Sequence, residues 1–227
     1  MSVVLDRGGG SLDHVALGVS DTLKGVRRIA DLFGIEPRVG EKPEPEQFYW
    51  SGVVPLGHGR FLEILGPNPD WQGSHPMIDV IRHFDEPQPL FWYVATQNIA
   101  EFASSASALG APLEMQQTFH HEREGVSISY TNAVIGPGFR STRPCVIEWH
   151  SRREWMDDAS QVTLERFELM SPIASQLNTL FRELGIRQEV KEGPEAMTLV
   201  LGTPKGQVEF SAPGFVVEEI PMPKAEA

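Results

Sequence analysis

The sequence has little cysteine and no long apolar run. Its one cysteine, Cys145, excludes an internal disulfide framework and any zinc site built from several cysteines. Because Cys145 lies in an apolar run, we expect a buried and unreactive thiol. No run approaches the ~20 apolar residues of a membrane-spanning helix, and the N-terminus lacks the charged-then-apolar pattern of a secretory signal. We therefore expect a cytoplasmic protein that does not bind a membrane.

Basic residues are also scarce. The 19 Lys and Arg residues face 31 Asp and Glu residues, which gives a formal net charge of −12. Nucleic-acid binding needs a basic surface, so we expect no nucleic-acid partner. The run Gly8-Gly9-Gly10 has neither a preceding strand nor the lysine of a phosphate-binding loop, so it does not predict a nucleotide site.

What the sequence does contain is one helix pattern that occurs three times. In each copy a hydroxyl residue is followed 14 positions later by a glycine. The pairs are Ser20 and Gly34, Thr96 and Gly110, and Ser171 and Gly185. A capping hydroxyl and a terminal glycine mark the two ends of a short helix. An apolar segment precedes each pair, and an extended stretch with a strand-like glutamate follows it.

This repetition predicts an α+β fold made of tandem βαβββ modules. We expect a flexible leader at 1–11, a first module at 12–66, a linker at 67–88, a second module at 89–152, a third, degenerate module at 162–212 and an irregular acidic tail at 213–227. In the second module the segment around 120–124 reads as a solvated loop. The third module is expected either to pack on the back of the first two or to pair across a homodimer.

Three polar residues stand inside apolar strands. They are His14, Glu63 and Glu148. Such groups are seldom buried unless they are paired or bound to a metal. His150 follows Glu148 by two residues, so on a strand both side chains share one face. A solvent-facing strand edge would also explain the two glutamates.

Two segments resemble the glyoxalase, or vicinal-oxygen-chelate, superfamily. They are Leu12-Asp13-His14-Val15-Ala16-Leu17-Gly18-Val19-Ser20-Asp21 and Arg60-Phe61-Leu62-Glu63-Ile64-Leu65. The resemblance implies the glyoxalase/bleomycin-resistance/dioxygenase fold, in which curved mixed sheets form a concave cleft around a divalent metal. It also implies His14, Glu63 and Glu148 as metal ligands, with zinc, manganese, nickel or iron(II) as suitable ions. The fourth ligand of the family comes from the first strand of the second module. Counted back from Thr96 by the spacing between His14 and Ser20, that position is Leu90, and Trp92 is its neighbour on the same face. Neither side chain can bind a metal.

The resemblance implies a metal-dependent lyase or isomerase, or a dioxygenase-type enzyme, that acts on a small oxygenated metabolite. Glu148 or His150 would transfer the proton. The residues expected to contact the substrate are Trp92, Tyr130, Asn132, Arg140 and Arg143. Two alternatives stay open: a metal-free protein that binds a small molecule at a degenerate site, and an interaction scaffold without a cleft.

Overall fold

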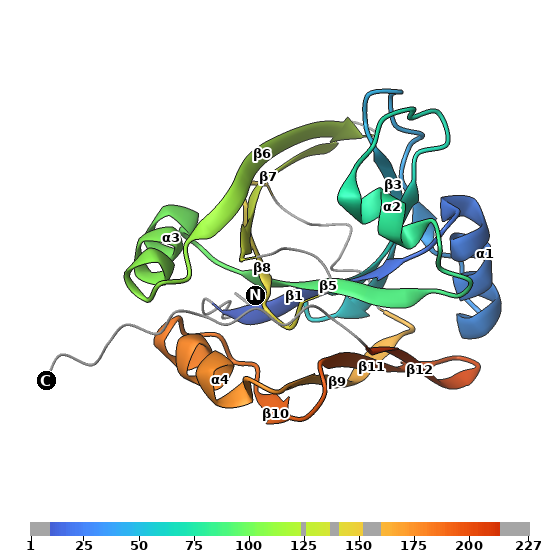
Figure 1. The fold of residues 1–227 in the computed structure, drawn as a ribbon. Coiled ribbons are helices and arrows are strands. Elements are labelled where there is room, and N and C mark those ends of the chain that lie inside the picture. Colours follow the sequence, from blue (N-terminus) through green and yellow to red (C-terminus); the bar gives the residue numbers. More distant parts are fainter. Residues whose placement is uncertain (1–9, 124–125, 137–140, 152–159, 214–227) are drawn as a thin grey trace, which may run out of the picture.

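The computed structural model describes residues 10–123, 126–136, 141–151 and 160–213. They form twelve strands and four helices in three successive units (Figure 1). Within this part of the chain no helix is long and apolar enough to cross a membrane. The fold is α+β, with mixed sheets and few helices, as the sequence predicts.

The first unit has the predicted order of one strand, one helix and three strands. Its elements are β1 (Ser11–Gly18), α1 (Thr22–Phe33), β2 (Arg38–Val39), β3 (Tyr49–Gly57) and β4 (Arg60–Pro67). Helix α1 buries the apolar side chains Val26, Ile29 and Phe33 on one face. The helix ends at Gly34, whose φ of 74° is the left-handed conformation that glycine adopts most readily.

The second unit repeats that order after a linker. The linker carries the short helix α2 (Pro76–Ile81), and the unit itself has β5 (Gln88–Ala95), α3 (Ile99–Ala108), β6 (Leu113–Arg123), β7 (Val126–Ile135) and β8 (Cys145–Trp149). The expected loop around 120–124 is wrong, because the chain from Leu113 to Arg123 is a strand that pairs with β7. Its alternation of polar and apolar residues was too weak to reveal it.

The first two units share one sheet of eight strands in the order β2-β3-β4-β1-β5-β8-β7-β6. The two first strands, β1 and β5, lie antiparallel at its centre, and each pairs in parallel with the last strand of its own unit. The sheet is therefore built of two similar halves. It curves strongly, with β6 and β7 rising on one side and β3 on the other (Figure 1).

The third unit has the same element order but a different sheet. Its elements are β9 (Thr163–Ser171), α4 (Ala174–Glu183), β10 (Val190–Glu192), β11 (Ala196–Thr203) and β12 (Gly206–Pro213), and its strand order is β10-β9-β11-β12. The first strand, β9, pairs with β11, whereas β1 and β5 pair with the last strand of their units. The third unit is therefore not a copy of the pairing found in the other two.

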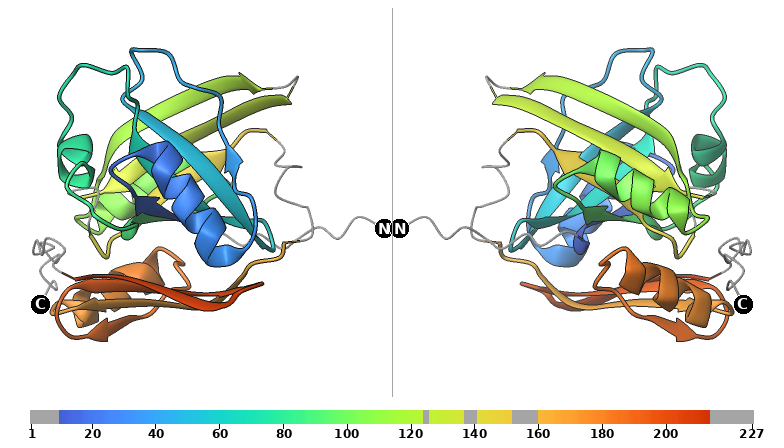
Figure 2. Two further views of the ribbon diagram at one scale, coloured as in Figure 1. Left: turned by 90° about the vertical axis from the view of Figure 1, so that its right-hand side faces the viewer. Right: turned by 90° about the vertical axis from the view of Figure 1, so that its left-hand side faces the viewer.

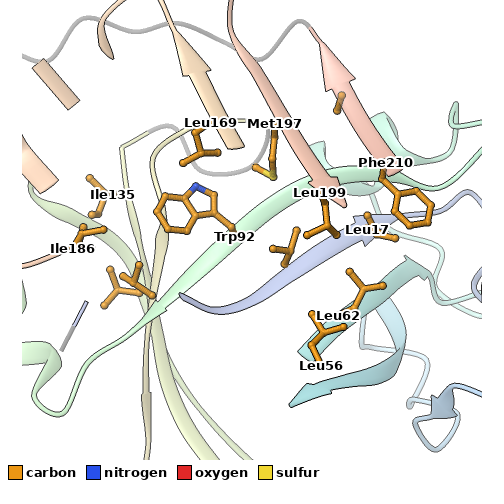
Figure 3. Close-up of a cluster of buried hydrophobic side chains, with 14 of the residues drawn as sticks. Leu17, Leu56, Leu62, Trp92, Ile135, Leu169, Ile186, Met197, Leu199 and Phe210 are labelled. Atoms are coloured by element: carbon orange, nitrogen blue, oxygen red, sulfur yellow. The ribbon is translucent and has the colours of Figure 1, made fainter. Parts of the chain in front are cut away.

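The sheet of the third unit packs beneath the centre of the large sheet, on its convex side (Figure 2). One apolar cluster joins the two layers, with Trp92 and Leu17 on the large sheet meeting Leu199 and Phe210 on the small one (Figure 3). Of the two expected arrangements, the chain has the one in which the third unit covers the back of the first two. This leaves the concave face of the large sheet uncovered by the third unit.

The helix starts differ from the predicted ones, whereas the ends agree. Asp21 and Asn98, not Ser20 and Thr96, cap α1 and α3 by accepting a backbone N–H. Helix α4 has no side-chain cap at all. The three glycines Gly34, Gly110 and Gly185 all have a positive φ at the helix ends. The glycine ends were easier to predict, because few other residues adopt that backbone conformation.

Candidate functional site

The two faces of the large sheet differ in chemistry. On β4, Leu62 and Ile64 enter the apolar core between the sheets, so the alternate residues Phe61 and Glu63 point to the concave face. His14 on β1 lies directly opposite Phe61 and Tyr93 in the register and shares their face. The first module therefore brings its two predicted ligand residues to the concave face together.

The His14 ring is held firmly on this face. It stacks between the rings of Phe61 and Tyr93, with centroids 4.2 and 4.1 Å away and 20° between the planes in both cases. Its Nδ1 lies 2.8 Å from Oδ1 of Asp13, and only 5% of the side chain is exposed. A hydrogen bond from Nδ1 to the carboxylate leaves Nε2 as the nitrogen directed at the site.

Asp13 reaches that position because the strand is irregular there. Leu12 pairs with Val94 and His14 pairs with Tyr93, so the register shifts by one residue at Asp13. A β-bulge of this kind re-aims side chains that would otherwise alternate between the faces. The buried Asp13 carboxylate also accepts a hydrogen bond from Nε1 of Trp149 at 3.2 Å, which ties β1 to β8.

Glu63 is the main acidic group on the concave face. Its Oε2 lies 3.9 Å from Nε2 of His14, and 16% of its side chain is exposed. Burial raises the pKa of the Glu63 carboxyl above its ordinary value, an effect that the His14 ring and a hydrogen bond with Ser51 only partly offset. A carboxyl of this kind exchanges protons closer to neutral pH than a surface glutamate does.

All three tyrosines of the chain lie within range of the charge of this carboxyl. Tyr49 lies on β3, Tyr93 on β5 and Tyr130 on β7. Burial and the nearby Glu63 charge raise the pKa of each phenol, that of Tyr49 to about 12. The phenols therefore stay protonated at neutral pH and can donate hydrogen bonds to an oxygen atom of a ligand.

Cys145 also belongs to this face. It is 4% exposed and is hydrogen-bonded to Tyr93, and burial raises the pKa of its thiol to about 12. A thiol with so high a pKa is a poor nucleophile. The expectation of a buried thiol is confirmed.

Glu148, the predicted third metal ligand, lies on the opposite face. On β8, Cys145 and Trp149 contact the concave-face residues, so Glu148 points to the convex side. There its Oε2 accepts the backbone N–H of Ile99 at 2.8 Å, at the start of α3. The prediction that Glu148 joins His14 and Glu63 is therefore wrong. Side chains alternate between the two faces along β8, and Glu148 stands at a position that faces the convex side.

His150 shares the face of Glu148, as its two-residue spacing predicts. Its Nε2 lies 2.8 Å from Oγ1 of Thr131, and its Nδ1 lies 3.6 Å from Oε1 of Glu148. Both residues are thus separated from His14 and Glu63 by the sheet. Neither can serve as the proton-transfer group of the concave face, which corrects that part of the sequence-based expectation.

Trp92 is likewise a core residue and not a substrate contact. It is fully buried on the convex side, where it packs against Phe167 and Phe181 of the third unit. Its Nε1 donates to the carbonyl oxygen of Thr142 at 3.0 Å, which satisfies the polar atom of the indole. The prediction for Trp92 is wrong for the same reason as that for Glu148.

The remaining predicted contacts divide into two groups. Tyr130 and Asn132 do lie on the concave face, where Nδ2 of Asn132 is 3.5 Å from the Tyr93 hydroxyl. Arg143 is 8% exposed, and its guanidinium packs against the backbone at Gly136. Arg140 lies outside the described residues. The substrate-binding role of both arginines stays a prediction.

The strand registers identify the true counterparts of the first module's ionisable pair. His14 pairs with Phe61, and Tyr93 pairs with Cys145, at equivalent points of the two halves. Two positions further along β8, where β4 has Glu63, stands Ile147. The second module thus offers Tyr93 and Ile147. Counting from the helix missed Tyr93, because Tyr93 lies two residues before the end of β5, whereas His14 lies four residues before the end of β1.

We tested whether the donors present fit a divalent metal. His14 and Glu63 face each other, but among the described residues no group of three His, Cys, Asp or Glu side chains could share an ion. Protein sites for zinc and iron(II) use at least three such ligands. The described donor set therefore does not fit the metal centre that the resemblance implies.

Two surface hollows lie away from this cluster. One of about 240 Å³ lies between α3 and α4 and is lined by Asn98, Glu101 and Glu183. The other, of about 200 Å³, lies beside the start of α1. Neither is lined by His14 or Glu63, and neither combines a buried carboxyl with hydrogen-bond donors. The concave-face cluster is therefore the stronger candidate site.

Comparisons with known proteins agree with this architecture. Residues 12–185 match the model of a family described as a glyoxalase-like domain. No curated protein matches in sequence.

Solved structures match in fold. A hypothetical protein from Staphylococcus aureus is similar at 10% identity with a TM-score of 0.57, over 88% of this chain and 84% of that one. A mutant of 4-hydroxymandelate synthase from Streptomyces coelicolor is similar at 11% identity with a TM-score of 0.55, over 93% of this chain and 66% of that one. At such identities the likeness shows the fold alone. With the family model covering most of its length, the chain belongs to the glyoxalase-like domain family of the vicinal-oxygen-chelate superfamily.

Proposed function

We propose that this protein binds a small carbonyl compound on the concave face of the large sheet and moves a proton on it with Glu63. The reaction class is that of an isomerase or lyase, which is one branch of the sequence-based expectation. The observation that carries the proposal is the Glu63 carboxyl itself: it is largely buried, its pKa is raised, and its Oε2 lies 3.9 Å from Nε2 of His14.

Glu63 has the properties of a general base. A raised pKa makes its carboxylate more basic, while 16% exposure of the side chain leaves it reachable. Proton transfer by a positioned side chain contributes about 10²- to 10⁴-fold in rate. His14, fixed by Asp13 and by the two stacked rings, presents Nε2 to the same space and supplies a second polar contact for the ligand.

The ligand surface of the site is aromatic as well as polar. The Tyr130 ring lies 5.1 Å from the Trp149 ring, and Phe91 meets Tyr93 edge to face at 5.5 Å. Such walls bind the apolar part of a small molecule and exclude water, and the hydroxyl and amide groups orient its oxygen atoms. This combination supports a compact organic substrate.

A metal-dependent reaction is the second candidate, and one observation favours it. The chain Asp13–His14–Glu63 resembles the way in which a carboxylate fixes the tautomer of a metal-binding histidine. Against it stands the absence of a third ligand among the described residues. Metal analysis of purified protein separates the two: one ion per chain that is lost in His14→Ala would support the metal, and a metal-free active protein would count against it.

The proposal is tested by proton exchange in D2O. Protein is incubated with a panel of α-keto acids, α-hydroxy ketones, β-diketones and acyl thioesters, and the loss of each α-proton is followed by NMR. We expect at least one class to exchange, and Glu63→Gln to slow that exchange by about 10²- to 10⁴-fold.

Glu148→Gln is the matched control. It makes the same change on the same sheet, but on the convex face, where the Gln side-chain oxygen can still accept the Ile99 N–H. Exchange at the normal rate in Glu148→Gln and slow exchange in Glu63→Gln would support the proposal. Equal rates in both variants would refute it. A panel member that raises the melting temperature but never exchanges would point to the binding-protein alternative.

A further inference from the structure

The linker helix α2 packs on the concave face, on the side of the large sheet opposite the third unit (Figure 1). Its side chains Met77, Ile78 and Ile81 are buried in an apolar cluster with Ala16 of β1 and Phe91 of β5. This cluster is separate from the core between the two sheets. One end of the concave face is therefore closed by a part of the chain that belongs to neither module.

Glu63 stands at the border of this cluster. In the strand registers, Ala16 is the partner of Glu63 on one side and of Phe91 on the other. Ala16 is fully buried and Phe91 is 6% exposed, so the row of side chains that holds the carboxyl is dry toward β1 and β5. The next row holds Leu65 and Gly18, which are buried as well. A ligand at Glu63 therefore extends toward the other end of the face, away from α2.

The linker lies close to the sheet because small residues stand beneath it. A Cβ atom on Gly18 would lie 2.8 Å from Cε2 of Phe84 and 2.9 Å from Cγ2 of Ile81, closer than Cβ contacts in proteins come. Both of these side chains are buried, Ile81 completely. Ala16 and Gly18 thus provide a seat for the linker, one row or about 7 Å along the strand beyond Glu63.

The N-terminal end of α2 is fixed too. The His75 ring stacks on Phe48 with centroids 4.1 Å apart and 11° between the planes, and its Nδ1 accepts the backbone N–H of Met77 at 3.3 Å. Nδ2 of the buried Asn68 donates to two backbone carbonyl oxygens in the segment that leads into β3, at 2.9 and 2.8 Å. These contacts tie the linker to the first module, so α2 forms a fixed wall.

We propose that Phe84 and Ile81 limit the size of the substrate at the carbon from which Glu63 takes the proton. This inference rests on the proposed function and narrows its substrate class. The reacting carbon carries hydrogen atoms and at most one methyl group, because the wall begins about 7 Å further along the strand. Any longer part of the molecule lies on the other side of the carbonyl, toward Phe61 and Trp149, whose rings are 6.4 Å apart.

The first arm of the test measures α-proton exchange along two homologous series. They are pyruvate, α-ketobutyrate and α-ketovalerate, and the acetyl, propanoyl and butanoyl thioesters of N-acetylcysteamine. In each series the substituent on the reacting carbon grows from hydrogen to methyl to ethyl. One methylene in an apolar pocket changes the rate about 10- to 200-fold, so we expect a drop of that size from the methyl to the ethyl member.

Phe84→Ala should raise the ethyl-to-methyl rate ratio about tenfold or more, because it removes the ring at the wall. Phe84→Leu keeps most of the apolar volume and should raise the ratio less, which retains the test if the alanine variant fails to fold. Phe181→Ala is the matched control. It deletes an equally buried ring from the core on the convex side and should leave the ratio unchanged.

The second arm measures binding of the same compounds by NMR titration in the Glu63→Gln background. Phe84→Ala should tighten the binding of the ethyl member relative to the methyl member, and Phe181→Ala should not. This result in a protein that exchanges no α-proton would support the size limit and reject the proton-transfer function.

The opposite combination rejects the inference alone. Exchange that depends on Glu63, with the same ethyl-to-methyl ratio in Phe84→Ala, Phe84→Leu and Phe181→Ala, would overturn the size limit and leave the proposed function standing. Neither exchange nor binding of any member would reject both. Circular dichroism of each variant checks that the compared proteins are folded.

Discussion

The two halves of the large sheet have the same elements and matching registers, yet they contribute different chemistry to the concave face. At equivalent positions the first half has His14 and Glu63, and the second has Tyr93 and Ile147. The first half also has a bulge that turns Asp13 toward His14. In the second half the residue before Tyr93 is Trp92, which stays in the convex core.

This difference shows that the fold constrains the convex face of the sheet, whereas the candidate site depends on the residues of the concave face. Both halves keep apolar residues on the convex face, because the third unit packs there. The third unit does not pack on the concave face, where the first half carries the ionisable pair His14 and Glu63 and the second half carries neutral residues at the equivalent positions. One half can supply proton transfer while the other supplies neutral contacts, so the site is asymmetric although the sheet is nearly symmetric.

The largest expected effect comes from making the halves alike. The double substitution Tyr93→His with Ile147→Glu would add a histidine and a carboxylate where the register places them opposite His14 and Glu63. Four such ligands suit zinc, nickel or manganese, so we expect binding at micromolar Kd or tighter, about 8 kcal/mol. Calorimetry measures the Kd for the metal, and the double variant Tyr93→His with Ile147→Gln is the control. Metal binding no tighter than in the unaltered chain would show that the positions are not equivalent.

Trp92 tests the assignment of the two faces. Trp92→Ala removes a fully buried ring from the junction with the third unit and should cost about 3–5 kcal/mol of unfolding free energy. Urea unfolding measures the loss. Proton exchange per folded molecule should be unaltered, because the ring lies on the far side of the sheet from Glu63. Normal stability combined with lost ligand binding would instead show that Trp92 contacts the ligand.

Glu63 should cost stability at neutral pH. Its folded-state pKa is raised above the unfolded value, so its contribution to stability is favourable below the unfolded pKa and is lost as the pH rises through the folded one. Replacing it with Gln, which is neutral like Ile147 in the other half, should stabilise the protein at pH 7 by about 0.5–2 kcal/mol. Melting curves of both proteins from pH 4 to pH 8 should converge toward acid. A gap that widens toward acid would contradict the raised pKa.

Glu148 should matter only to its helix. Glu148→Ala removes the acceptor of the Ile99 N–H at the start of α3 and should cost about 0.5–2 kcal/mol. Thermal unfolding detects the loss, and Glu148→Gln should recover part of it. A change in the rate of proton exchange in Glu148→Ala would place this residue in the site after all.

The sequence revealed the architecture because the helix-ending glycines and the apolar strands are local signals. His14 and Glu63 could also be recognised, since both lie in strongly apolar strands. The errors arose where one residue of strand phase decides the face. Glu148, His150 and Trp92 were each assigned to the wrong side of the sheet. A strand reverses every side chain when its phase shifts by one, and only the pairing of β5 with β1 and β8 fixes that phase.

The shared face of the tyrosines was equally hidden. Tyr49, Tyr93 and Tyr130 lie far apart in the chain, and only the strand phase puts all three on the concave side of the sheet. The bulge at Asp13 left no signal in the sequence either, because an aspartate followed by a histidine on a regular strand would face opposite sides.

The most direct test of the central claim is α-proton exchange by protein that has been treated with a chelator and shown by elemental analysis to be free of divalent metal. If Glu63 is the proton-transfer group, exchange should continue at the original rate and should be lost in Glu63→Gln. Exchange that stops on chelation and returns with added metal would contradict the account, and would mean that His14 and Glu63 act as metal ligands.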